Sequence, residues 1–452
     1  MLWNTELIEK YNLSGPRYTS YPTAPQFSTE ISKIALIEKM LTPSSKPLSL
    51  YFHIPFCAHL CYYCACNKIV TKQYDKGREY IELLEEELRL RSLMIQNDRP
   101  VTQLHFGGGT PTFLSCESIK TLFNTIHQYF NLLDDDSGDY SIEVDPREIN
   151  LEKLTCLRKL GFNRLSLGIQ DFDERVQKAI HRSQSVNLVS ELLEQARDLG
   201  FRSINFDLIY GLPFQSVESF ERTLDIVIEM SPDRLSIFNY AHLPERFPSQ
   251  KRILDTSLPN ASTKLAMLKR ISERLSEAGY IHIGMDHFAK KSDSLTIAQK
   301  NKELKRNFQG YTTHDETDLI AFGTSAISNF NNTYTQNHVN LEMYQKAIEN
   351  GQLPIVKGYI STEEDLVRQF VIMSLICHFE LNLEELKLKF NVSFDSYFAK
   401  EIVELHKLEK DNIVKLDHNK LQVTDTGRLL IRCVCMIFDQ YLNNGIRYSK
   451  VI

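Results

Sequence analysis

The chain has 452 residues, of which 42% are apolar and 24% are charged, and its formal net charge is −6 at pH 7. This length buries a full-size hydrophobic core, and the ordinary composition indicates a globular protein with one large domain and appendages. The acidic balance argues against nucleic-acid binding through a basic face. No apolar stretch is long enough to span a membrane, so neither nucleic acid nor a membrane is expected as a partner.

The nine cysteines divide into a group of four and five isolated residues. The isolated residues lie singly or in apolar helical surroundings: Cys116, Cys156, Cys377, Cys433 and Cys435. An odd number with this distribution favours a reducing cytoplasm over a disulfide framework. We therefore expect a cytoplasmic protein, and the acidic composition without large patches is compatible with a monomer.

The first 45 residues lack a sustained hydrophobic period and include a Pro- and Tyr-rich segment at residues 14–24. Such a segment is typical of an extended arm that carries little regular structure. We therefore predict an N-terminal arm over residues 1–45.

From Pro47 onward, apolar strands alternate with amphipathic helices. The predicted strands are residues 48–54, 103–106, 140–144, 164–169, 203–209 and 234–240, and the helices between them include residues 79–95 and 187–199. This alternation predicts an α/β fold whose parallel sheet has right-handed crossovers. Six repeats in one domain favour a partial (β/α)6 barrel of the TIM type over a doubly wound sheet.

The alternation ends near residue 289, and the pattern changes again at Ser361. The expected elements are helices at 364–378, 383–390 and 398–411, a strand–turn–strand at 413–423 and a last helix at 428–442. This winged-helix-like order is interpreted as a small packing domain, because the tail is no more basic than the rest of the chain. The predicted domains are the arm (1–45), the catalytic barrel with its extension (46–330), a connection (331–360) and a helical C-terminal domain (361–452).

Polar residues follow the predicted strands at their carboxyl ends, where α/β barrels bind ligands. The first strand leads to four cysteines, Cys57, Cys61, Cys64 and Cys66, and the second leads to the glycine run at residues 107–109. Later strands end at or near polar residues: Glu143, Gln170, Asp207 and Asn239. Six strands with such ends predict one common mouth.

Three kinds of site compete for the four cysteines. A structural zinc site usually takes its four ligands from two separated pairs, and all four cysteines here share one short loop. A ferredoxin-type cluster takes a remote fourth cysteine before Pro, and this sequence has no Cys-Pro. The third possibility is a 4Fe-4S cluster held by Cys57, Cys61 and Cys64, whose fourth iron stays open.

The spacing C-x₃-C-x₂-C, with Tyr63 before the third cysteine, resembles the radical S-adenosylmethionine superfamily. The resemblance implies that S-adenosylmethionine binds the open iron and is cleaved reductively to a 5′-deoxyadenosyl radical. Gly108 and its neighbours then suit close backbone approach to the cofactor. Cys66 is expected to stay unligated, because a fourth thiolate would close the iron that the cofactor needs.

Further segments resemble oxygen-independent coproporphyrinogen III oxidases over nearly the whole chain: residues 15–22, 51–57, 66–71, 283–288, 306–312 and 427–432. The resemblance implies an oxidoreductase, a coproporphyrinogen dehydrogenase with a 4Fe-4S cluster and two S-adenosyl-L-methionine molecules. It would convert two propionates of coproporphyrinogen III to vinyl groups, giving protoporphyrinogen IX in anaerobic haem biosynthesis. A flavodoxin- or ferredoxin-like electron donor is implied as a partner.

The family's cofactor contacts fall here on eleven residues: Tyr51, Tyr63, Gly108, Gly109, Thr110, Glu143, Gln170, Arg182, Asp207, Ala241 and Ile327. The four cysteines of the loop complete the expected catalytic set. The family often has Gly where this chain has Ala65, and a positive φ there would cost about 1 kcal/mol.

Two other functions remain alternatives. A haem-chaperone-like paralogue would bind haem without decarboxylating a substrate, but that family lacks the fourth cysteine and the N-terminal arm motif. An iron–sulfur electron carrier would bind a cluster without cleaving the cofactor. Arg17 and Arg147 are expected to meet substrate propionates or to form structural ion pairs, and His53 and His287 to bind ligand or to serve the fold.

Overall fold

The computed structural model describes residues 3–96, 98–314, 317–442 and 448. The chain forms two compact units. The barrel unit comprises Ser28–Ala278 and Glu316–Ile360, and the terminal unit comprises Met1–Phe27, Gly279–Asp315 and Ser361–Ile452. No helix within the described ranges is long and apolar enough to cross a membrane.

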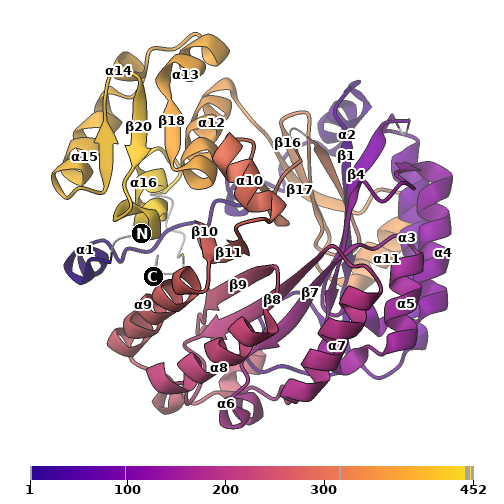
Figure 1. The fold of residues 1–452 in the computed structure, drawn as a ribbon. Coiled ribbons are helices and arrows are strands. Elements are labelled where there is room, and N and C mark those ends of the chain that lie inside the picture. The colour runs from indigo at the N-terminus through magenta and orange to yellow at the C-terminus, as the bar shows by residue number, and fades with distance from the viewer. Residues whose placement is uncertain (1–2, 97, 315–316, 443–447, 449–452) are drawn as a thin grey trace. The chain divides into compact units, whose positions relative to one another are not determined.

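Six parallel strands form the centre of the barrel unit (Figure 1). They are β1 (Leu48–Ile54), β4 (Pro100–Gly108), β6 (Asp139–Val144), β7 (Arg164–Gln170), β8 (Ser203–Tyr210) and β9 (Arg234–Asn239). Their order in the sheet is β9-β8-β7-β6-β4-β1, and each neighbouring pair is parallel. The predicted strands and their parallel arrangement are therefore confirmed, and β1 has the predicted bounds.

Amphipathic helices lie along the outside of these strands (Figure 1). They are α3 (Asp75–Ser92), α4 (Cys116–Tyr129), α5 (Leu151–Lys159), α6 (Glu174–Ala179), α7 (Val186–Asp198), α8 (Val217–Met230) and α9 (Ala261–Glu277). Helix α3 buries Ile81, Leu84 and Leu88, whose spacing of three and four places them on one face. Polar N-cap side chains begin α4, α5, α7 and α8: Ser115, Asn150, Ser185 and Ser216.

The sheet continues beyond the six predicted strands. Strand β14 (Asp318–Phe322) pairs in parallel with β1, and β15 (Ile327–Phe330), β16 (Thr333–Asn337) and β17 (Ile355–Ile360) follow in antiparallel order. The prediction of a mere connection at 331–360 is therefore wrong, because this segment holds β16, β17 and helix α11 (Leu341–Glu349). The buried face of β16 is made of polar residues, so the strand lacks the apolar alternation that would have predicted it.

Short elements complete the barrel unit. These are α2 (Lys33–Leu41), β2 (Phe56–Cys57), β3 (Ile69–Val70), β5 (Asn131–Leu132) and the 3-10 turns η2 (Pro111–Phe113), η3 (Pro146–Glu148), η4 (Pro248–Arg252) and η5 (Asp255–Ser257).

The terminal unit gathers three separate segments of the chain. It contains α1 (Thr5–Lys10), η1 (Ala24–Gln26), the hairpin β10 (Tyr280–Gly284) and β11 (His287–Lys290), α10 (Ser294–Asn301), and the hairpin β12 (Lys305–Asn307) and β13 (Gly310–Thr312). Its C-terminal part contains α12 (Glu363–His378), α13 (Leu383–Phe390), α14 (Phe394–Tyr397), α15 (Ala399–Lys410), η6 (Gly427–Leu430) and α16 (Ile431–Ile437). Three antiparallel strands accompany these helices: β18 (Glu380–Asn382), β19 (Val414–Leu416) and β20 (Lys420–Val423).

This C-terminal arrangement agrees with the predicted winged-helix-like order, with β18 as an additional strand and a shorter last helix. The compact units, however, differ from the predicted domain boundaries. One apolar core joins Tyr18 and Tyr21 of the arm to Ile283, Ile376 and Val434. Residues far apart in sequence share this core, so hydrophobic burial draws 1–27 and 279–315 to the C-terminal segment.

Cys116 and Cys156 form a disulfide, with their Cα atoms 6.4 Å apart. The expectation that both residues stand alone is therefore wrong. Cys116 begins α4 and Cys156 lies in α5, and packing of these helices brings together residues that are 40 positions apart. Cys377, Cys433 and Cys435 are buried and free, as expected.

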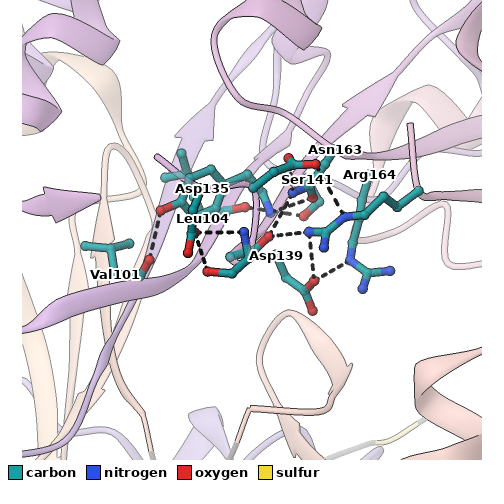
Figure 2. A network of polar contacts seen from close by, with 12 residues as sticks. Val101, Leu104, Asp135, Asp139, Ser141, Asn163 and Arg164 are labelled. Atoms are coloured by element: carbon teal, nitrogen blue, oxygen red, sulfur yellow. Dashed lines mark hydrogen bonds and ion pairs between the residues drawn. The ribbon is translucent and has the colours of Figure 1, made fainter. Parts of the chain in front are cut away.

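A polar network holds the edge of the sheet where β6 and β7 begin (Figure 2). Arg164 Nε donates to Asp139 Oδ1 at 2.7 Å, and these two residues begin the neighbouring strands. The side chain of Asn163 accepts from Tyr140 N–H at 3.1 Å and donates to Asp136 at 3.0 Å. This amino-terminal edge of the barrel is thus occupied by structural contacts, which leaves ligand chemistry to the opposite edge.

A buried carboxylate links α3 to the added strands. Glu87, which is 0% exposed, accepts hydrogen bonds from Arg91 Nε at 2.9 Å, Asn337 Nδ2 at 2.9 Å, Gly323 N–H at 2.8 Å and Tyr344 Oη at 2.7 Å. All four lone-pair directions of the carboxylate are therefore used, in a site without access to water.

We expect Glu87→Ala to lower the free energy of unfolding by about 3–5 kcal/mol, because Arg91 would remain charged, buried and without its carboxylate. Urea denaturation measures this loss. The control is Glu86→Ala on the same helix, whose exposed ion pair with Arg89 is worth about 1 kcal/mol or less. Equal losses in the two variants would contradict a structural role for the Glu87 network.

Candidate active site

The cysteine loop starts directly at the carboxyl end of β1. The segment that follows the fourth cysteine pairs with the first residues of the loop. β2 pairs in parallel with β3, so Ile69 N–H donates to Pro55 O at 2.7 Å and Thr71 N–H donates to Cys57 O at 3.0 Å. The ten residues that carry the four cysteines are therefore closed into one compact loop at the mouth of the barrel.

Polar donors point at two of the thiol groups. Thr110 Oγ1 donates to Cys57 Sγ at 3.4 Å. Arg182 Nη1 and Arg147 Nη2 approach Cys61 Sγ at 3.4 and 3.6 Å. These contacts place hydrogen-bond donors and positive charge at the sulfur atoms, where they complement metal-binding thiolates.

The cysteines differ in exposure and in protonation. Cys57 and Cys61 are buried, Cys64 is half-buried and Cys66 is exposed. Burial raises the pKa of the Cys57 thiol to about 12. A hydrogen bond from Cys66 is the main cause that lowers the pKa of Cys64 to about 6, while burial opposes this shift. Cys66 is thus the protonated donor of this pair.

The donor set fits an iron–sulfur cluster better than a single ion. Within the described ranges, no three His, Cys, Asp or Glu side chains gather closely enough to hold one metal ion. Cys57, Cys61 and Cys64 instead lie along a single loop, each with a different environment. Three spaced thiolates suit a polynuclear iron–sulfur core, and the cationic groups beside Cys61 offset part of the negative charge of the thiolates.

The glycine run after β4 lies against the start of the cysteine loop. Gly109 N–H donates to Ile54 O at 2.8 Å, and a Cβ at Gly109 would come within 2.8 Å of the carbonyl groups of Pro55 and Phe56. Gly108 has a φ of +115°, and a Cβ there would lie 2.7 Å from the His53 ring. Glycine is therefore required at both positions, because Gly109 meets backbone and Gly108 combines a positive φ with the buried His53 ring.

Glu143 joins this glycine run to the next strand. Gly108 N–H donates to Glu143 Oε2 at 3.0 Å, and His105 Nε2 lies 3.4 Å from Glu143 Oε1. Burial raises the pKa of the Glu143 carboxyl, but the hydrogen bonds from His105 and Gly108 outweigh it and leave the pKa below its usual value. Tyr51 stacks on His105 with ring centroids 5.8 Å apart.

Asp207 lies on β8, and its pKa is shifted in the opposite direction to that of Glu143. Ser166 Oγ and Asn205 Nδ2 each donate to its carboxylate at 2.8 Å. Burial raises the pKa of Asp207 to about 6, and the charge of Glu143 acts in the same direction. Two buried carboxylates near each other form a site that favours a positively charged ligand.

Arg182 is fixed by three hydrogen bonds to two acceptors. Its Nε and Nη2 atoms donate to Gly168 O at 3.0 and 2.6 Å, and Nη1 donates to Asp145 Oδ2 at 2.9 Å. Arg147 pairs with the same Asp145 at 2.7 Å. Asp145 therefore positions both guanidinium groups that approach Cys61.

The other predicted site residues make fewer hydrogen bonds to the residues described above. Gln170 ends β7 with a φ of +69°. Gln250 Nε2 donates to Tyr63 O at 2.8 Å and to Ala241 O at 3.3 Å, and so joins these two predicted residues. Ile327 begins β15, among the added strands.

Three contributors were missed from the sequence: Ser166, Asn205 and Gln250. A signal existed for two of them, because Ser166 and Asn205 are the polar members of strands whose alternate residues are apolar. Gln250 lies in a 3-10 turn after β9, and no pattern in the sequence points to it.

The structure gives the two arginines the ion-pair role. Arg17 pairs with Asp286 within the terminal unit, and Arg147 pairs with Asp145. His53 Nε2 lies 3.0 Å from Asn67 O, and burial lowers the pKa of its ring. His287 packs edge-on against Tyr311. Ala65 is not among the described residues with positive φ, so the strain considered for it does not arise.

Comparisons with known proteins point in one direction. The Radical SAM superfamily profile matches residues 51–227, and the HemN C-terminal domain profile matches residues 361–430. The oxygen-independent coproporphyrinogen III oxidases of Pseudomonas aeruginosa and Escherichia coli are 50% and 47% identical to this chain, with 100% of this chain and 99% and 98% of the relatives covered.

A solved structure supports the same relation. It is described as coproporphyrinogen III oxidase (HemN) from Escherichia coli, a radical SAM enzyme. It matches with a TM-score of 0.93 and 46% identity, over 98% of this chain and 99% of the other. The family expected from the sequence motifs is thereby confirmed. The chain belongs to the oxygen-independent coproporphyrinogen III oxidases, which are radical S-adenosylmethionine oxidoreductases with a 4Fe-4S cluster.

Proposed function

We propose that the chain decarboxylates two propionate side chains of coproporphyrinogen III to vinyl groups, giving protoporphyrinogen IX in anaerobic haem biosynthesis. The observation that carries this proposal is the cysteine loop at the barrel mouth, with Thr110 and Arg182 directed at its sulfur atoms. The family relation over the full chain supports the same reaction.

In this proposal, Cys57, Cys61 and Cys64 hold three irons of the cluster, and Cys66 stays unligated. The exposed position of Cys66 and its hydrogen bond to Cys64 are compatible with that role. When bound, the cluster and S-adenosylmethionine would supply a 5′-deoxyadenosyl radical to take a hydrogen atom from the propionate β-carbon. The vinyl group would then form with loss of CO₂ and of one electron, which an external electron acceptor takes up. The chain itself needs no acid–base pair at that carbon.

The residues proposed to bind two S-adenosylmethionine molecules surround the strand ends: Tyr51, Tyr63, Gly108, Gly109, Thr110, Glu143, Gln170, Arg182, Asp207, Ala241 and Ile327. The cofactor carries a sulfonium and an ammonium group, so the carboxylates of Glu143 and Asp207 complement its charge. Gly108 N–H holds Glu143 in place, while Ser166 and Asn205 hold Asp207.

The remaining tasks of the chain are orientation and exclusion of water. Arg182 and Arg147, both anchored on Asp145, keep positive charge beside Cys61. Their charges are thereby committed to the cluster side, so neither is assigned to substrate. The reaction also needs an external reductant, for which we propose a flavodoxin- or ferredoxin-like protein, and we propose a monomer in the cytoplasm.

The decisive test is anaerobic reconstitution with iron and sulfide, followed by incubation with reductant, S-adenosylmethionine and coproporphyrinogen III. We expect 5′-deoxyadenosine and the divinyl product protoporphyrinogen IX, measured by chromatography. 5′-Deoxyadenosine is the readout of the radical step, and the divinyl product is the readout of decarboxylation. Absence of both would reject the proposal, and tight haem binding without product would favour a haem-chaperone function.

Two serine variants separate the roles of the cysteines. We expect Cys61→Ser to lose most of its cluster iron and visible absorbance, because a ligand is removed. The matched variant Cys66→Ser should keep the iron content of the parent protein, since Cys66 is proposed not to bind iron. Iron analysis and anaerobic absorbance spectra measure both. Loss of iron in Cys66→Ser would make Cys66 a ligand and contradict the assignment.

The raised pKa of Asp207 predicts a pH-dependent gain in stability for Asp207→Asn. Above pH 6 the folded protein holds a carboxylate whose ionisation burial disfavours, so the substitution should stabilise the ligand-free protein by about 2–3 kcal/mol at pH 8. The gain should shrink as the pH falls below 6, because Asp207 then becomes protonated in the folded state, and it should vanish only below the unfolded-state pKa of 3.8.

Urea denaturation at pH 8 and pH 4.5 measures this difference. The control Asp198→Asn, on the exposed end of α7, should change stability little at either pH. A gain for Asp207→Asn that is the same at both pH values would show that the titration of this carboxyl is not the cause.

A further inference from the structure

A cavity of about 630 Å³ borders the cysteine loop within the barrel unit. Its lining comes from the cysteine loop, from η4 with the preceding Phe247, and from Val339 after β16, and it includes Cys64, Cys66, Lys68 and Arg252. We name this cavity the cationic pocket. Except for Cys64 and Cys66, its lining shares no residue with the proposed cluster and S-adenosylmethionine sites.

The cationic pocket is the place where the cysteine loop reaches solvent. Cys57 and Cys61 at the start of the loop are buried, whereas Ala65 and Cys66 at its end are exposed and line the pocket. Cys64, one of the proposed cluster ligands, lines it as well. The pocket therefore offers a short path between solvent and the thiolates of the cluster.

The charge of the pocket contrasts with that of the whole protein. The chain has a net charge of −6, yet the lining contains Lys68 and Arg252 and no Asp or Glu. Lys68 Nζ donates to Cys64 O at 3.0 Å, and the guanidinium of Arg252 lies over the Tyr62 ring at 5.1 Å. Neither cation forms an ion pair with a carboxylate in the described part of the chain.

The rim extends this positive character. Lys251 and Arg246 are exposed next to the pocket lining, and the guanidinium of Arg246 packs over the Phe247 ring at 5.5 Å. Val339 and Pro248 add exposed apolar area. Exposed apolar residues beside these four cations, with the exposed carboxylate of Glu245 next to Arg246, leave a net positive surface of the kind that binds an acidic protein transiently.

We propose that the cationic pocket and its rim form the docking surface for an acidic one-electron carrier protein that reduces the cluster. This inference rests on the proposed function, because that function requires electrons from outside the chain. One electron leaves the reduced carrier and enters the oxidised cluster, and no bond of this chain forms or breaks. Docking here brings the carrier next to the exposed end of the loop, and electron-transfer rates fall steeply with distance.

Arg252→Glu tests the proposal, because this exposed side chain lines the pocket and, among the residues that the structure describes, its side chain contacts Tyr62 alone. The probe is a flavodoxin, an acidic carrier. We expect the Kd of the oxidised flavodoxin, measured by titration calorimetry at low ionic strength, to rise about fivefold to tenfold. The affinity of the parent protein should also fall with added salt, as expected for complementary charged surfaces.

A kinetic comparison separates docking from catalysis. We expect Arg252→Glu to slow formation of 5′-deoxyadenosine with reduced flavodoxin about fivefold or more at low salt, and to leave the rate with reduced methyl viologen unchanged. Methyl viologen is small and cationic, so it does not need the proposed surface. The control Lys120→Glu makes the same charge change on α4, outside the pocket, and should match the parent protein in every assay.

The outcomes are distinct. Unchanged flavodoxin affinity and unchanged flavodoxin-driven rate in Arg252→Glu would overturn the proposal. A raised KM for coproporphyrinogen III with methyl viologen as reductant would also overturn it, because the pocket would then bind substrate propionates. Failure of the parent protein to form 5′-deoxyadenosine with either reductant would reject the proposed function, while the flavodoxin titration would still decide whether the surface docks an acidic carrier.

Discussion

The site depends on the close approach of two backbones, where the glycine run after β4 lies against the start of the cysteine loop after β1. Gly109 N–H donates to Ile54 O, and there is no room for a Cβ at Gly108 or Gly109. The parallel pairing of β1 with β4 sets this approach, since both loops leave the sheet at the same edge. The contact puts Thr110 within hydrogen-bond distance of Cys57 and Gly108 within reach of Glu143. One backbone contact thus positions both the hydroxyl that donates to the Cys57 sulfur and the backbone N–H that donates to the Glu143 carboxylate.

Charge is divided across the barrel mouth. Positive groups gather on the sulfur side, where Asp145 positions Arg147 and Arg182 beside Cys61. Negative groups gather farther along the strand ends, where burial and the charge of Glu143 disfavour ionisation of Asp207. A cluster of thiolates and a cationic cofactor complement these two fields respectively. The outer face of the same loop is again positive, at Lys68 and Arg252, so an electron carrier and a cofactor would meet the loop from surfaces of opposite charge.

The architecture was predictable from the sequence wherever the buried positions are apolar and recur with the period of a strand or a helix. The six strands of the barrel are apolar at alternate positions or throughout, and the helices between them repeat at three and four, so their existence and parallel order were predictable. Prediction failed where buried positions are polar. Thr333, Thr335 and Asn337 of β16 face the interior with their hydroxyl and amide groups, and 331–360 therefore resembled a connection. The Cys116–Cys156 disulfide was missed for a related reason, because helix packing and not sequence spacing joins the two residues.

The chemical class of the site, a cluster of thiolates beside a cofactor-binding glycine run, can be predicted from the sequence alone. The spacing of Cys57, Cys61 and Cys64, the glycines after the second strand and the polar residues at the strand ends all lie within short segments, whose local geometry is a property of the chain itself. Which charged side chains lie beside the cysteines, by contrast, becomes clear from the tertiary structure. Arg147 was open to substrate until its pairing with Asp145 placed it beside Cys61, and Ser166, Asn205 and Gln250 gained roles through neighbours distant in sequence. Hydrogen bonds and ion pairs act over a few ångströms of space, and distance along the sequence does not reveal them.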